Sequence, residues 1–245
     1  MLPYLDAVEC VAVDLPGHGE SHHRDPSSLL HYVDYVRDIK LILDELGWEH
    51  CHLLGHSMGG ALSLIAASAL PDTILSLTML DSLHPLSRRP DQGPEMLKRS
   101  LQQFTAWDPH RETTFPDLDA VVKARLKASP FQQTEASARL IMEYATEKVA
   151  RGYRLRSDAR LNFRSPLMLS PPQTEAFIQA VEQPVLVVLG AQGIVQHRGP
   201  VEETLRLFRN VQHITIEGGH HVHMDEPKLI SERFLEFIQA QAETT

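Results

Sequence analysis

Hydrophobic residues follow two alternating patterns along the chain. A short, nearly continuous apolar run at 8–14 predicts a strand that is buried on both faces, and four further short segments predict strands at 50–54, 74–80, 184–190 and 211–217. Three longer stretches repeat their apolar residues at helical spacing or are rich in alanine and leucine, and predict helices at 28–46, 61–70 and 228–241. Strands that alternate with helices predict an α/β fold with a mostly parallel sheet and helices on both faces.

The stretch 83–183 has a different pattern. It is polar and interrupted by prolines, shows helical periodicity at 118–126 and 134–149, and contains no strand-like run. We interpret it as a helical cap inserted between the two parts of the core, 1–82 and 184–245. Five aromatic residues of the cap are candidates either for a substrate pocket or for internal packing: Phe104, Trp107, Phe131, Tyr144 and Tyr153.

Composition and charge limit the classes of partner. A net charge of -9 over 245 residues argues against nucleic acid or an anionic membrane as the main partner, because either requires a basic surface. No segment reaches the roughly 20 apolar residues that span a bilayer, and the N-terminus lacks a signal-peptide pattern. Cys10 and Cys51 lie in strand-like runs, so we expect reduced, buried side chains. We therefore expect a cytoplasmic protein with a small-molecule substrate; the sequence leaves its oligomeric state open.

A candidate nucleophile lies between the second strand-like run and the helix after it. Gly55-x-Ser57-x-Gly59 occupies the strand–turn–helix setting that a nucleophile elbow requires, and glycines on both sides relieve crowding in this turn. The elbow would expose the Ser57 hydroxyl and place the backbone N–H of Met58 in an oxyanion hole. The alternative is a glycine-rich turn with an incidental serine.

A serine nucleophile needs a base to take its proton. The segment after the last predicted strand, Glu217-Gly-Gly-His-His-Val-His223, supplies three candidates. We assign the base to His220, which directly follows the turn glycines, and expect His221 and His223 to pack or hydrogen-bond beneath the loop. A solvated loop histidine is the alternative for His220.

The third member of a triad is an acid that orients the imidazole. One usual place follows the penultimate strand, but no carboxylate occurs between Glu182 and Glu202. The other place is the end of the strand after the elbow helix, where Asp81 stands. We therefore predict Asp81 as the acid, with a turn-capping role as the alternative.

These motifs together resemble the α/β-hydrolase superfamily, in particular its serine hydrolase-like branch. The resemblance runs along nearly the whole chain and rests on residues 14–21, 55–60, 152–161 and 219–225. It implies ester-type hydrolysis by a Ser–His–Asp triad, without cofactor or metal. It also implies a further N-terminal region that carries early strands and a His-Gly oxyanion loop. The chain would then begin just before the fourth strand, with the N-terminal part of the fold missing and its activity reduced.

Two other functions are consistent with parts of the sequence. A metal-dependent hydrolase could use the His-x-His-x-Asp spacing of 221–225, together with His22 and His23. A catalytically impaired or non-catalytic protein could be built on the same fold, since fold alone does not guarantee chemistry. Dehalogenases and epoxide hydrolases of this fold use aspartate at the elbow, so Ser57 argues against both.

Overall fold

The computed structural model describes residues 1–111, 113–129 and 132–242, which form two compact units. The core unit comprises Met1–Val11, Val36–Ser87 and Leu169–Thr245. The second unit comprises Ala12–Tyr35 and Arg88–Met168. The predicted cap at 83–183 therefore overlaps most of the second unit, which in addition includes residues 12–35.

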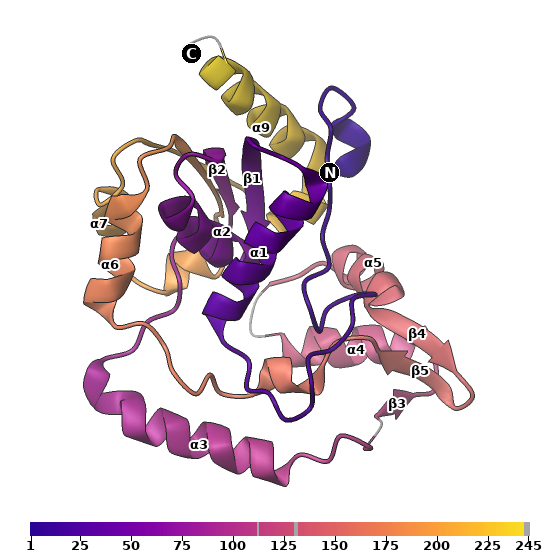
Figure 1. The fold of residues 1–245 in the computed structure, drawn as a ribbon. Helices are drawn as coiled ribbons and strands as arrows, with labels where there is room; N and C mark the ends of the chain where they lie inside the picture. The colour runs from indigo at the N-terminus through magenta and orange to yellow at the C-terminus, as the bar shows by residue number, and fades with distance from the viewer. Residues whose placement is uncertain (112, 130–131, 243–245) are drawn as a thin grey trace. The chain divides into compact units, whose positions relative to one another are not determined.

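The core unit is built on one four-stranded sheet (Figure 1). Its strands are β1 (Cys51–His56), β2 (Ile74–Leu80), β6 (Val185–Gly190) and β7 (Val211–Ile216). They lie in the order β1-β2-β6-β7 and every neighbouring pair is parallel. The prediction of a parallel sheet is confirmed, and four of the five predicted strands form it.

Helices connect and cover these strands. They are α1 (Tyr32–Leu46, which begins in the second unit), α2 (Met58–Ala69), α6 (Pro171–Ala180), α7 (Val201–Leu205), α8 (Val222–Asp225) and α9 (Pro227–Ala242), with short 3-10 turns η1 (Leu2–Tyr4) and η4 (Val195–His197). All six residues of β6 are buried, as its continuous apolar run predicts for a strand covered on both faces. Helix α9 packs its apolar side on Leu80, Leu186 and Val188.

The strand predicted at 8–14 is wrong. This segment has no regular secondary structure, and Val11 and Val13 are exposed. Strand β1 pairs with β2 on one side, and no strand among the described residues pairs with its other side. A strand exists only when a neighbour satisfies its backbone groups, so the apolar pattern alone was insufficient. Cys10 is exposed for the same reason, against our expectation, whereas Cys51 is buried.

The second unit contains strands that the sequence pattern did not predict. Strands β3 (Thr114–Phe115), β5 (Gly152–Leu155) and β4 (Thr146–Val149) form an antiparallel sheet in that order. Its helical elements are η2 (Pro90–Gln92), α3 (Gly93–Ala106), α4 (Leu118–Ala128), α5 (Glu135–Ala145) and η3 (Ala159–Asn162). The helical periodicity at 134–149 thus ends at Ala145, because the next four residues pair with β5 in a hairpin.

A buried arginine holds two distant segments of the second unit together. The Arg160 guanidinium forms an ion pair with Asp158 at 2.7 Å, and both side chains are almost fully buried. The same group stacks over Trp107 at 5.0 Å and donates to backbone carbonyls of the loop before α1, at Arg24, Asp25 and Ser28. These bonds explain why residues 12–35 belong to this unit.

The aromatic candidates for a pocket have mostly structural contacts. Trp107 packs against Arg160, and Phe104 lies 6.4 Å from the Trp107 ring. Tyr153 packs against the small apolar core formed by α4 and α5. Tyr144 is exposed, and its hydroxyl donates to Asp14. Phe131 lies outside the described residues.

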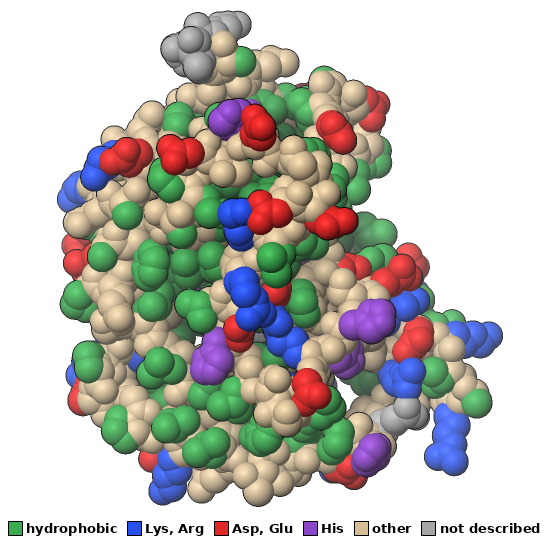
Figure 2. Space-filling view, viewed as in Figure 1, with side chains coloured by type: hydrophobic (Ala, Val, Ile, Leu, Met, Phe, Trp, Pro, Cys, Tyr) green, Lys and Arg blue, Asp and Glu red, His purple; other side chains and the backbone are tan. Residues whose placement is uncertain are grey.

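Two surface features bear on partners. Among the described residues, no helix has the length and apolar character that crossing a bilayer requires. On the face drawn in Figure 2, acidic and basic side chains are interspersed among hydrophobic ones, rather than gathered into one large basic area.

Candidate active site

Ser57 lies in a strained turn between β1 and α2. Its φ of 53° is positive, and only one other described residue that is not glycine shares this feature, namely Asp81 with φ 39°. The Ser57 N–H donates to the carbonyl of Leu80 at 3.0 Å, and its own carbonyl accepts from the Ser82 hydroxyl at 2.8 Å. These bonds to the end of β2 hold a backbone conformation that would otherwise cost about 1–3 kcal/mol. Such strain is common where a side chain must be presented for function.

The two elbow glycines are not equivalent. A Cβ at Gly55 would clash with the backbone of Gly59 and Gly60, so this position requires glycine. A Cβ at Gly59 would meet no atom within 4 Å outside its own helix. The expectation that both glycines relieve crowding is therefore wrong for Gly59; on the helix side the crowded position is Gly60, where a Cβ would lie 2.6 Å from the Cβ of Ser82.

Met58 is the first residue of α2. The first N–H groups of a helix have no acceptor within the helix and carry the positive end of its dipole. Helix α2 is regular from its first turn, since the Ala61 N–H donates to the Ser57 carbonyl at 3.1 Å. The Met58 N–H is thus located where it can stabilise negative charge beside Ser57, and its oxyanion role stays a prediction.

Asp81 and His220 meet although 139 positions separate them in the chain. The Nδ1 atom of His220 lies 2.6 Å from Oδ2 of Asp81, and the Asp81 side chain is completely buried. The carboxylate also accepts from the backbone N–H groups of Ile194 at 2.9 Å and Gly190 at 3.3 Å. Because a carboxylate only accepts, the His220 proton lies on Nδ1, and Nε2 keeps the lone pair that a general base needs.

His220 lies between β7 and α8, and its backbone is held by a residue of the elbow. The Nε2–H of His56 donates to the His220 carbonyl at 2.7 Å, and the two rings are 4.6 Å apart. The sequence motif gave no indication of this bond. The position of His56 directly before the nucleophile was the available signal, but the partner is 164 residues away.

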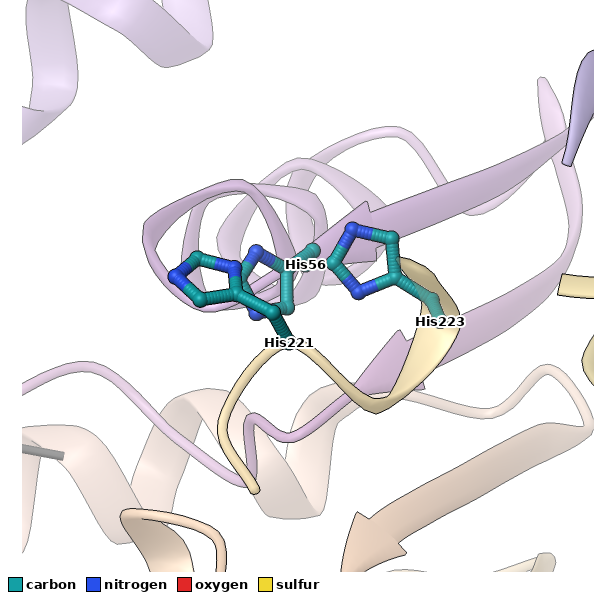
Figure 3. A group of neighbouring side chains, drawn as sticks. All are labelled: His56, His221 and His223. Carbon is teal, nitrogen blue, oxygen red and sulfur yellow. The ribbon is translucent and has the colours of Figure 1, made fainter. Parts of the chain in front are cut away.

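His56 also belongs to a group of three histidines with His221 and His223 (Figure 3). One ring nitrogen from each lies within 4.8 Å of the others. Burial lowers the pKa of His56 well below its ordinary value and lowers the pKa of His223 to about 4. The sequence linked His221 and His223 to Asp225 in a possible metal motif; the structure instead joins these two histidines to His56.

Residues 1–227 match the family described as alpha/beta hydrolase fold. The chain belongs to this family. It is 24% identical to a serine hydrolase-like protein of Danio rerio over 242 residues, which is 95% of this chain and 74% of the relative. It is 28% identical to a probable serine hydrolase of Drosophila melanogaster over 251 residues, 98% and 76% of the two chains.

A solved structure agrees with the fold of this alpha/beta hydrolase. The crystal structure of a hypothetical protein from Pseudomonas aeruginosa PAO1 has 32% sequence identity and a TM-score of 0.89, covering 97% of this chain and 84% of the other. The resemblance to the serine hydrolase-like branch is confirmed by these relatives. They support hydrolase activity in general, without identifying a substrate.

Proposed function

We propose that this alpha/beta hydrolase is a serine hydrolase that cleaves an ester-type bond, a carboxylic ester or a thioester, in a small molecule. Ser57 is the nucleophile, His220 the base and Asp81 the acid that orients it. The buried hydrogen bond between Asp81 and His220 carries the proposal, because it gives the imidazole the tautomer that can accept a serine proton.

The reaction follows from these assignments. His220 Nε2 takes the hydroxyl proton of Ser57 as the oxygen attacks the acyl carbon, and the Met58 N–H stabilises the oxyanion. The protonated imidazole then gives its proton to the leaving oxygen or sulfur. Water, activated by His220, attacks the acyl-enzyme and releases the acid, which regenerates the Ser57 hydroxyl. We also propose that residues 83–183 act as a cap that determines substrate specificity. The cytoplasmic location stays a prediction.

Fluorophosphonate labelling of the purified chain tests the nucleophile. We expect one labelled serine in the wild type and none in Ser57→Ala, because only an activated hydroxyl attacks the phosphorus centre. Ser68→Ala is a matched control in α2, the helix that follows Ser57; the Ser68 hydroxyl donates to the Ile65 carbonyl, and this variant should label normally. A folded wild type that does not label would favour the non-catalytic alternative.

Hydrolysis of short-chain p-nitrophenyl esters tests the reaction class. We expect turnover that Ser57→Ala abolishes and that chelators do not lower, because the proposed steps need no metal. Loss of turnover after chelation would instead favour the metal-dependent alternative.

A further inference from the structure

We propose that His56, His221 and His223 form a binding site for one divalent transition metal ion, with zinc as the probe, and that its occupation displaces the neighbouring His220. The site goes beyond the hydrolase reaction, which needs no metal. The effect on His220 rests on the proposed function, whereas metal binding itself does not.

The donor set is suited to such an ion. Imidazole is a good ligand for zinc, copper and nickel, and three histidines with one open position make a common zinc arrangement. The nitrogens of the three rings lie within 4.8 Å of one another. In tetrahedral zinc coordination the nitrogens lie about 3.4 Å apart, so the group must contract by up to about 1.4 Å. Figure 3 shows the rings of His221 and His223 on either side of His56.

Two hydrogen-bond features favour metal over simple packing. Metal-ligating histidines usually donate their second ring N–H to a carbonyl or carboxylate, which fixes the ring. His56 already does so, since its Nε2–H donates to the His220 carbonyl and leaves Nδ1 with the lone pair. The Nδ1 atom of His223 is shielded from solvent and has no hydrogen-bond partner among the described residues. A shielded nitrogen without a partner is costly, and a metal ion would satisfy it.

The three rings pack closely within the core unit. The His56 ring lies 4.2 Å from that of His223 and 5.0 Å from that of His221. The rings come from two places, the end of β1 and the α8 region, which the sheet brings together. A metal therefore would join the elbow to the segment that carries His220.

Contraction of the site moves the base. His221 directly follows His220 in the chain, and their rings are 5.0 Å apart. Drawing His221 toward His56 shifts this segment, while Nδ1 of His220 is held by Asp81 at 2.6 Å. A small displacement of an aligned base costs on the order of 100-fold in rate, so the occupied enzyme is inhibited.

Zinc titration of the full 245-residue chain, freed of metal by chelator, tests the site by calorimetry. We expect one zinc ion per chain, and binding about 100-fold weaker in His223→Phe, which keeps the ring but removes the ligand. His213→Gln, an exposed histidine of β7, is the control and should bind like the wild type. His221→Phe is a second variant if His223→Phe does not fold. Equal zinc binding by the wild type and a folded ligand variant overturns the site, as does no binding by the wild type.

Cobalt and activity measurements add independent readouts. Cobalt bound to the wild type should show the strong visible absorption of a tetrahedral site, and this signal should be absent from His223→Phe. Zinc should lower the rate of ester hydrolysis by the wild type at least tenfold, and chelator should restore it. The same zinc concentration should lower the rate of His223→Phe by a much smaller factor. Zinc that binds at the site but leaves an active wild type unaffected overturns the displacement of His220. A chain with no esterase activity that still binds zinc contradicts the proposed function and supports the site.

Discussion

Replacing Asp81 by asparagine isolates the contact that carries the proposed function. The wild-type carboxylate accepts from His220 Nδ1 at 2.6 Å and from the N–H groups of Ile194 and Gly190, in a fully buried position. Asparagine is nearly the same size, and its oxygen can still accept from the Gly190 N–H, but its NH2 replaces Oδ2, so the Ile194 N–H loses its acceptor. Its amide NH2 then faces His220, where it can donate but not accept. His220 must move its proton to Nε2, the atom that has to accept from Ser57.

The magnitude follows from this change of tautomer. Loss of a hydrogen bond to a charged group costs about 1.5–3 kcal/mol, and the imidazolium formed during reaction also loses its counter-charge. Replacement of a triad aspartate by asparagine lowers the turnover of serine proteases about 10⁴-fold. We expect kcat for Asp81→Asn to fall about 10³- to 10⁴-fold, equivalent to about 4–5.5 kcal/mol of barrier. The free energy of unfolding should fall by only about 1–3 kcal/mol.

The assay compares kcat for a short-chain p-nitrophenyl ester with thermal unfolding of the same samples. Asp72→Asn removes an exposed carboxylate in the turn before β2 and should leave both measurements unchanged. If Asp81→Asn stays folded and retains kcat within tenfold of the wild type, the assignment of Asp81 as the orienting acid is refuted.

Three further perturbations test other parts of the reasoning. Gly193→Ala should lower both activity and the melting temperature, because its Cβ would clash with the Asp81 carboxylate; we expect about 1–3 kcal/mol of lost stability, measured by urea unfolding. Arg160→Met should lower the free energy of unfolding by about 3–5 kcal/mol, since it leaves the Asp158 carboxylate buried without its ion-pair partner. Urea unfolding of the double variant Arg160→Met/Asp158→Asn should show that part of this lost stability is recovered. Lowering the pH from 7 to 5 should destabilise the wild type by up to about 2 kcal/mol through His223, because the unfolded chain takes up a proton below pH 6.5 that the folded side chain, with a pKa of about 4, does not. His223→Phe should show a smaller loss over this interval, and an equal loss would contradict this pKa.

The local features of the chain could be predicted from the sequence because they depend on short-range rules. A continuous apolar run such as β6 is buried on both faces in any fold that holds it, and the run at 74–80 forms β2 with the predicted bounds. The strand–serine–helix order of the elbow is likewise local, since it requires only that Gly55 and the first turn of α2 lie close together. The prediction of His220 as the base used only its place after the last strand, and its catalytic role stays a prediction.

Tertiary structure decided what depends on distant partners. The segment at 8–14 has the apolar pattern of a strand but no neighbour to pair with, whereas the polar residues of β4 form a strand because β5 lies beside them. Absence of a carboxylate after β6 made Asp81 a choice by elimination, and only the fold brings it within 2.6 Å of His220. The hydrogen bond from His56 to the His220 carbonyl, and the grouping of His56 with His221 and His223, cannot be predicted from the spacing of these residues in the sequence. The periodicity of apolar residues predicts which side chains are buried. Hydrogen bonds between residues far apart in the chain form only when the sheet brings the ends of its strands together, so they depend on the tertiary structure.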